Sequence, residues 1–178
     1  MKRVKLFSLL LVVVVVASCS KDNSPAPGHE QAVYDVVFNI VTVSANFQVS
    51  TSQIKRLTEV LSASNKDKVP YVKGAETQMS SSNIKIQGLT KGSALKTVAL
   101  NVLDEQGKTV YTYNINLAIA ISNETLTDDT NSCMTFISNV NNYLAAKKNI
   151  NLQIVINGGT EDVSNLKVTL HSSAIFSW

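Results

Sequence analysis

The strongest constraint on the fold of this chain is an alternation of apolar and polar residues that recurs along most of its length. Within 95–103, Val98, Leu100 and Val102 fall on one side of a two-residue period. The same period returns in four further segments, at 84–87, 111–121, 150–156 and 166–178. Successive side chains of a β-strand point to opposite faces of its sheet. Each segment is therefore predicted to be a strand with one buried face.

Two other local signals describe how these strands are connected. Asp104-Glu105-Gln106-Gly107 is predicted to be a hairpin turn, because a late glycine adopts a positive φ at little cost. The long segment 32–49 also alternates, but its apolar set changes phase at Val41. A change of phase predicts either a β-bulge or a strand that passes from one sheet to another.

Two segments follow a helical period instead. Residues 132–148 carry an apolar stripe at spacings of three and one, and Lys147 and Lys148 at their end suit the helix dipole. The stripe consists of Cys133, Phe136, Ile137, Val140, Tyr143 and Leu144. A shorter helix is predicted over 50–62, where four apolar residues have helical spacing. A short strand over 68–73 would lie at a sheet edge because it contains Pro70.

Many strands, two helices and regular turns together predict a mainly β protein. Residues 31–178 are numerous enough for one domain with its own core. The expected architecture is a single antiparallel β-sandwich with one or two connecting helices. An immunoglobulin-like topology and a jelly roll both fit this pattern of strands, and the sequence does not choose between them.

The first nineteen residues have a different character. Lys2, Arg3 and Lys5 precede an apolar run from Leu6 to Ala17 that only Ser8 interrupts. This pattern is typical of a secretory signal and is too short to be interpreted first as a membrane span. The ending Val-Ala-Ser-Cys, which closes on Cys19, resembles the lipobox of bacterial lipoproteins.

The lipobox resemblance implies a processed and anchored chain. Residues 1–18 would be the signal peptide, and the sulfur of Cys19 would carry diacylglycerol that holds the protein on a membrane. Residues 19–30 contain two prolines, a glycine and no apolar face, so a flexible tether is expected there. The charged pair Lys21-Asp22 resembles the region after the cysteine in Bacteroidetes lipoproteins, and Ser20 is compatible with sorting to the outer membrane.

Removal of the signal changes the charge of the chain. The full sequence has 16 basic and 13 acidic residues, a formal charge of +3, but three of the basic residues lie within residues 1–18. The chain from Cys19 onward is therefore close to neutral. Nucleic-acid binding requires clustered Lys and Arg to neutralise phosphates, so no nucleic-acid partner is expected.

No catalytic motif or metal-ligand spacing stands out among the reactive residues. Cys133 has no intrachain partner once Cys19 is acylated, and a small buried residue on the predicted helix is the favoured interpretation. His29 lies in the tether, and His171 falls on the polar face of the last strand. The acidic loops around Asp128 and Glu161 lack the spacing of a known cation site. No enzyme activity, cofactor or metal site is expected.

These observations predict a location and a broad class of function. The chain is expected to be an outer-membrane lipoprotein, on the periplasmic face or the cell surface, anchored through Cys19. There it would act as a non-catalytic binding module for a glycan or a protein, with loops at one end of the sandwich as the contact region. The alternative is a fimbrial or adhesion subunit that exchanges a strand at an open sheet edge. The sequence identifies no ligand-binding residue.

Overall fold

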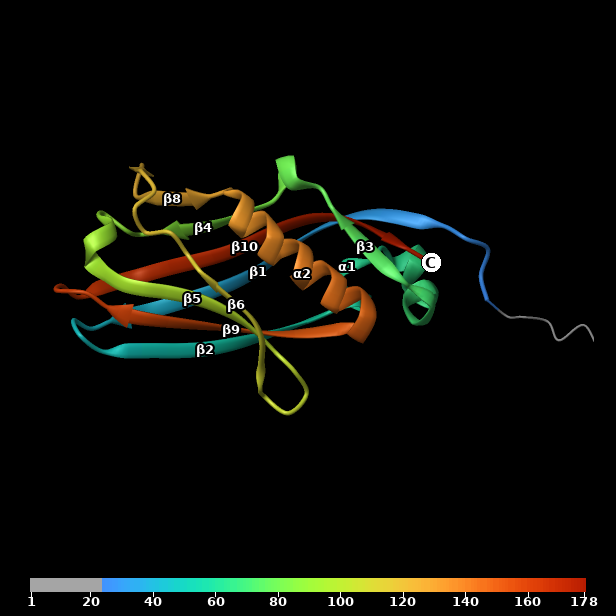
Figure 1. Cartoon of the computed structure of the whole chain (residues 1–178), viewed down its shortest axis with the longest axis horizontal. Coiled ribbons are helices and arrows are strands. Elements are labelled where there is room, and N and C mark those ends of the chain that lie inside the picture. The colour runs from blue at the N-terminus through green and yellow to red at the C-terminus, as the bar shows by residue number, and fades with distance from the viewer. Residues whose placement is uncertain (1–23) are drawn as a thin grey trace, which may run out of the picture.

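The computed structural model describes residues 24–178, so the predicted signal peptide and Cys19 lie outside the described residues. Two antiparallel sheets lie face to face, and the helix α2 crosses beside them (Figure 1). The six-stranded sheet consists of β1 (His29–Val43), β10 (Val163–Ser177), β4 (Asn83–Gln87), β8 (Thr125–Asp128) and β7 (Ile121–Ser122), with β3 (Gly74–Thr77) also on β10. The four-stranded sheet consists of β2 (Gln48–Arg56), β9 (Asn149–Gly158), β5 (Leu95–Leu103) and β6 (Thr109–Asn114). The expected antiparallel β-sandwich is confirmed.

The order of the strands identifies the topology as a jelly roll. The pairs β5·β6, β4·β8, β2·β9 and β1·β10 are nested one outside the next around the turn between β5 and β6. The chain thus resembles one long hairpin that has been rolled so that neighbouring pairs fall in opposite sheets. Such nesting distinguishes a jelly roll from an immunoglobulin-like sandwich. The topology that the sequence left open is therefore determined by strand pairing.

The predicted change of phase near Val41 corresponds to a passage between the two sheets. β1 ends at Val43 in the six-stranded sheet, and β2 begins at Gln48 in the four-stranded sheet. Asn46 takes a left-handed conformation in the connection, with φ of 62°. Asparagine tolerates this conformation better than most residues, so the chain can turn sharply there.

Helix α2 (Asn131–Lys147) completes the core along one side of the sandwich, in contact with strands of both sheets. Its predicted apolar stripe is confirmed, since Phe136, Ile137, Val140 and Leu144 are all buried. Thr130 caps the start of the helix by accepting a hydrogen bond from the backbone N–H of Cys133. No helix in residues 24–178 has the length and apolar character needed to cross a membrane.

The predicted helix over 50–62 is wrong. β2 continues to Arg56 and pairs with β9 along its whole length, and only one helical turn follows, α1 (Leu57–Val60). Ile54, which would have belonged to the apolar stripe, is 57% exposed. Pairing with the long strand β9 determines the secondary structure of this segment. The spacing of four apolar residues along the chain does not indicate that pairing.

Two further boundaries differ from the sequence prediction. The segment 68–73 is not a strand: a 3₁₀ helix, η1 (Ala63–Tyr71), occupies most of it, and the edge strand is β3, directly afterwards. The expected strand over 111–121 is divided between β6 and β7, which belong to opposite sheets. Two short 3₁₀ turns, η2 (Met79–Ser81) and η3 (Gly92–Ala94), complete the connections.

Candidate functional site: a polar sheet face and its groove

Uncharged polar side chains cover much of the outer face of the four-stranded sheet. Core residues of β9 and β5, such as Ile154 and Leu100, point inward, so the alternate residues point outward. We call the outward residues of three consecutive rows, which begin at the Gln48 end of the sheet, the amide face. They are Gln48, Ser50 and Ser52 of β2, Gln153, Val155 and Asn157 of β9, Thr97, Ala99 and Asn101 of β5, and Thr112 and Asn114 of β6. None of these side chains carries a charge.

Hydrogen bonds between strands hold the amide face in place. Thr112 Oγ1 donates to Asn101 Oδ1 at 2.9 Å, and Asn101 Nδ2 donates to Gln153 Oε1 at 3.2 Å. One end of the sheet has a second relay, from Gln48 through Asn157 to Thr97, with bonds of 3.1 and 2.6 Å. Side chains fixed in this way lose less conformational entropy when a ligand binds to them.

A groove of about 250 Å³ opens at the edge of this face, beside the last turn of α2. We call it the hairpin groove, because the turn between β5 and β6 forms one wall. Its lining consists of Ile54, Leu103, Asp104, Glu105, Tyr143, Lys147, Asn149 and Asn151. Asp104 Oδ1 accepts hydrogen bonds from the backbone N–H groups of Gln106 and Lys108, which fixes the hairpin. The predicted hairpin turn is confirmed, with Gly107 at a φ of 78°.

Asn151 is the polar residue of the groove whose side chain has an unsatisfied hydrogen-bond acceptor. In the sheet register it lies between Ile54 and Leu103, whose side chains offer no hydrogen bond. Its Oδ1 is buried and has no hydrogen-bond partner within residues 24–178. A buried acceptor without a donor costs about 1–3 kcal/mol. Rotation of the Asn151 side chain toward the groove would let a ligand donor offset this cost.

Tyr143 adds an aromatic surface and a neutral hydroxyl to the groove. Burial raises the pKa of Tyr143, and the nearby carboxylates of Asp104 and Glu105 raise it further. The phenol therefore stays protonated and can both donate and accept a hydrogen bond. The ring of Tyr111 meets it edge-on, with centroids 6.4 Å apart, and holds it in position.

The residues that the sequence singled out lie apart from this site. Cys133 is completely buried, its Sγ donates to the backbone oxygen of Asp128 at 3.1 Å, and burial raises the pKa of its thiol to about 12. This confirms a small buried residue on the helix. His171 Nδ1 lies 2.6 Å from Asp35 Oδ1 on the outer face of the other sheet. The expectation that His29 lies in the tether is wrong, because His29 begins β1 and pairs with Ser177.

The two acidic loops have structural partners. Asp128 is fully buried and accepts hydrogen bonds from Tyr113 Oη at 2.5 Å and Thr130 Oγ1 at 2.8 Å. Glu161 pairs with Lys91 at 2.5 Å, and Asp162 accepts from the backbone of Ala45. Within residues 24–178, no group of three His, Cys, Asp or Glu side chains is placed to hold a metal ion.

The sequence did not reveal the amide face, because none of its polar residues forms a motif along the chain. Asn101 and Gln153 come from different strands, and only the strand register brings them together. The one available signal was the run of Asn, Gln, Ser and Thr at outward positions of predicted strands. Charged residues are the more usual choice at exposed positions.

Comparisons with known proteins found similarity at the level of structure alone. No protein-family model matches the chain, and no curated protein matches it. A solved structure from Desmodium yellow mottle tymovirus aligns with a TM-score of 0.36 and 10% identity, over 84% of this chain and 88% of the other. A solved structure of the decameric BFDV capsid protein aligns with a TM-score of 0.34 and 8% identity, over 84% of this chain and 98% of the other.

Proposed function

We propose that this chain is a lipid-anchored binding module of the bacterial outer membrane that holds a neutral glycan on the amide face and in the hairpin groove. The observation that carries the proposal is the combination of a fixed, uncharged amide and hydroxyl surface with a groove at its edge. Sugar hydroxyls are both donors and acceptors, so they match amide and hydroxyl side chains better than a charged surface would.

The groove supports the same class of ligand. The unpaired Oδ1 of Asn151 requires a donor, which a sugar hydroxyl can supply once the buried amide rotates toward the groove. Tyr143 offers an aromatic surface beside it, and aromatic rings pack well against the C–H faces of sugars. Asp104 and Glu105 provide acceptors at the rim of the groove. The proposal assigns no catalytic role to any residue.

The ligand can be tested by affinity electrophoresis and a glycan array with the purified protein. Asn101→Ala combined with Gln153→Ala removes one relay of the amide face, and Asn151→Leu removes the unpaired acceptor of the groove. The double variant is expected to weaken retention by a neutral polysaccharide at least about tenfold, since two polar side chains are lost, and Asn151→Leu about fivefold, since it loses one hydrogen bond. Asn39→Ala, an exposed change on the other sheet, serves as the control and should leave retention unchanged.

A different pattern of binding would contradict the glycan proposal. Equal retention of the wild type and the Asn101/Gln153 variant would exclude the amide face as the contact surface.

Anchoring has its own test, in which the full chain is expressed in a lipidating bacterium with labelled palmitate. Label is expected on the wild type and not on Cys19→Ala, and equal label on both would contradict the anchor.

One observation favours a second candidate, the adhesion subunit that exchanges a strand. β6 pairs with β5 on one side only, so its other edge is free among the described strands. A second groove, of about 320 Å³, lies between that edge and α2, with Tyr113 and Phe136 in its lining. A donated strand could pair with β6 and place side chains in this groove. Concentration-dependent polymers that Val110→Pro prevents would support this candidate over the glycan.

A further inference from the structure

The described chain has no net charge, but its charges are unevenly distributed. Residues 24–178 contain twelve basic and twelve acidic side chains. We call the part of the domain built from residues 28–30, 55–76, 147–148 and 178 the anchor end. It contains seven of the basic side chains and four of the acidic ones, so the remainder carries five basic and eight acidic. The anchor end is therefore positive by three charges, although Asp104 and Glu105, which are counted with the remainder, line the hairpin groove beside Lys147 and offset its charge there.

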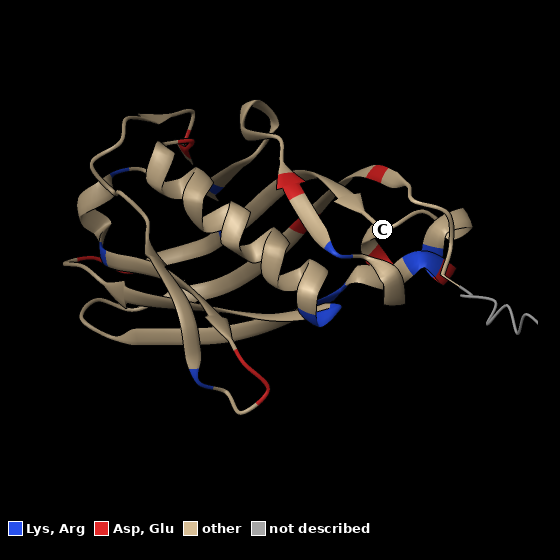
Figure 2. Cartoon of the chain, turned by 45° about the vertical axis from the view of Figure 1, so that its right-hand side comes forward, with Lys and Arg blue, Asp and Glu red and all other residues tan. Residues whose placement is uncertain are grey.

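Backbone and side-chain hydrogen bonds join these separate segments into one surface. Gly28 and Trp178 exchange two backbone bonds of 3.0 and 2.9 Å, and the indole lies against Gly28. Lys73 donates its backbone N–H to Ser177 at 2.8 Å, and Lys148 Nζ bonds to the backbone oxygen of Val72. Figure 2 shows Lys and Arg segments, with Asp and Glu segments beside them, near the point where the described chain begins.

The acidic residues of the anchor end are mostly occupied by partners. Glu59 pairs with Arg56 at 2.9 Å, and Asp67 pairs with Lys68 at 2.7 Å. The carboxylate of Glu30 accepts hydrogen bonds from Ser62 and Asn65. By contrast, Lys66 and Lys73 are exposed and form no ion pair within residues 24–178. The excess positive charge is thus available to an external partner.

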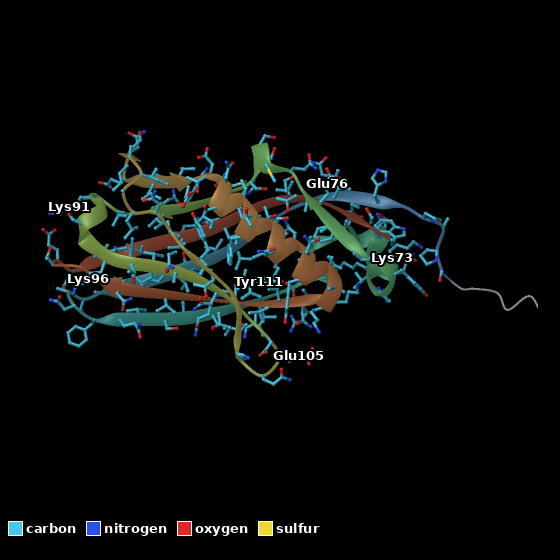
Figure 3. All side chains as sticks on the ribbon, in the orientation of Figure 1. Lys73, Glu76, Lys91, Lys96, Glu105 and Tyr111 are labelled. Atoms are coloured by element: carbon cyan, nitrogen blue, oxygen red, sulfur yellow. The ribbon has the colours of Figure 1, made fainter. Side chains whose placement is uncertain are left out.

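The opposite end of the sandwich has no such excess. Lys91 pairs with Glu161 at 2.5 Å, and Lys96 Nζ donates to Asn46 Oδ1 at 2.8 Å. Figure 3 shows Lys91 and Lys96 at one end of the molecule and Lys73 at the other. β1 and β10 run between the two ends and contain 15 residues each, which corresponds to about 50 Å.

The covalent chain limits the distance between the anchor end and a membrane. Cys19 and Gly28 lie nine positions apart in the sequence, and a fully extended segment of that length spans at most about 32 Å. If Cys19 carries lipid, the anchor end must stay within that distance of the headgroups, while the loops around Lys91 can lie much further away. The positive surface is therefore the one that the tether brings to the membrane.

We propose that the anchor end lies against the phosphate-bearing headgroups of the membrane, with Lys66 and Lys73 as its principal contacts. This inference rests on the proposed lipid anchor at Cys19. Lys and Arg near an anionic lipid surface are attracted to it over roughly a Debye length, about 8–10 Å at moderate salt. The long axis of the sandwich then stands away from the bilayer, and the amide face is presented to the side of the molecule, clear of the lipid.

Quenching by labelled lipids in reconstituted vesicles tests this orientation. The lipidated full chain carries a fluorophore on Ala63→Cys in η1 or, as the matched distal site, on Thr160→Cys. Buried Cys133 stays unlabelled. Vesicles contain a headgroup quencher in either zwitterionic phosphatidylcholine or a mixture with phosphatidylglycerol. Anionic lipid is expected to raise the ratio of quenching at 63 to that at 160 at least about threefold, and ionic strength near 1 M should reverse the increase.

Charge-reversal variants separate the lysines from the tether. Lys66→Glu with Lys73→Glu should abolish the increase, while Lys91→Glu with Lys96→Glu should leave it unchanged. A ratio that does not respond to anionic lipid, or that responds equally in both pairs of variants, would overturn the orientation. Vesicle flotation of each sample measures anchoring separately. Failure to float would overturn the anchor and the orientation together, whereas flotation without the change in ratio would overturn the orientation alone.

Discussion

Asn141 and Asp128 are polar side chains without exposed surface, and each joins α2 to the strands around it. Asn141 Oδ1 accepts bonds from Tyr34 Oη at 2.7 Å and Ser172 Oγ at 3.0 Å, and its Nδ2 donates to Thr77 at 2.7 Å. Its amide thus connects the helix to β1, β10 and β3. Buried polar groups of this kind fix one arrangement of the elements, because any other arrangement leaves them unpaired.

Replacement of Asn141 by alanine should therefore be costly. It removes three hydrogen bonds and leaves the buried hydroxyls of Tyr34 and Ser172 with fewer partners, so the free energy of unfolding should fall by about 2–4 kcal/mol. Asn142→Ala, at the exposed neighbouring position, should change it by less than about 0.5 kcal/mol. Urea denaturation of both variants measures the difference. Equal midpoints would show that the buried amide contributes little.

Cys133 is expected to be inert while the protein is folded. Its thiol is completely buried, and burial raises its pKa to about 12, so very little thiolate exists near neutral pH. In a chain whose Cys19 is lipidated or replaced by alanine, a thiol reagent at pH 8 should label Cys133 only after unfolding in guanidinium. Rapid stoichiometric labelling of the native protein would show that this part of the helix opens readily.

At the scale of elements, a helix or strand could be predicted where the apolar residues of its local pattern are also the ones that it buries in the core. α2 was recognised from its own apolar stripe, because that stripe is the surface it buries. The segment 50–62 was misjudged because Thr51, Gln53 and Lys55, which face inward on β2, are polar. The strand is held there by hydrogen bonds to β9. The amide face depends on register between strands, which no single segment encodes, so its residues could not be named from the sequence.

The joint between β1 and β2 depends on a glycine at the end of β9. A Cβ on Gly158 would lie 2.2 Å from the backbone oxygen of Ser44, so Gly158→Ala must displace the chain there. The change should lower the free energy of unfolding by about 2 kcal/mol or more. Gly74→Ala is the matched control, since no atom lies within 4 Å of its added methyl group. Similar melting temperatures for the two variants would contradict this close approach.

At the scale of the whole molecule, several acidic O–H and S–H groups are buried in the protonated form. Burial raises the pKa values of Tyr34 and Tyr113, and that of Cys133 is raised to about 12. In the unfolded chain these groups titrate at their ordinary values, near 10 for tyrosine and 9 for cysteine. At pH values between the unfolded-state and the folded-state pKa of a group, the unfolded chain has lost a proton that the folded chain retains.

The sandwich should therefore become less stable as the pH rises from about 9 to 12. The stabilisation from these groups is fully present below their unfolded-state pKa values, and each group lowers the free energy of unfolding by up to about 1.4 kcal/mol per pH unit above them. Urea denaturation across this range measures the slope. Tyr34→Phe should make the slope shallower and also remove one hydrogen bond to Asn141. An unchanged slope would exclude Tyr34 as a source of the alkaline loss.

The nested pairing of the strands has a consequence for the moment at which the domain can form. β10, among the last residues of the sequence, lies inside the six-stranded sheet between β1 and β4, and His29 pairs with Ser177. Until β10 is available, β1, β3 and β4 lack their partner, and only α2 and the hairpins of β5 with β6 and β7 with β8 can form from local contacts. A chain threaded through a secretion channel from its N-terminus would stay unfolded until almost all of it had emerged. The jelly roll thus cannot close until the residues of β10 are available to pair with β1 and β4.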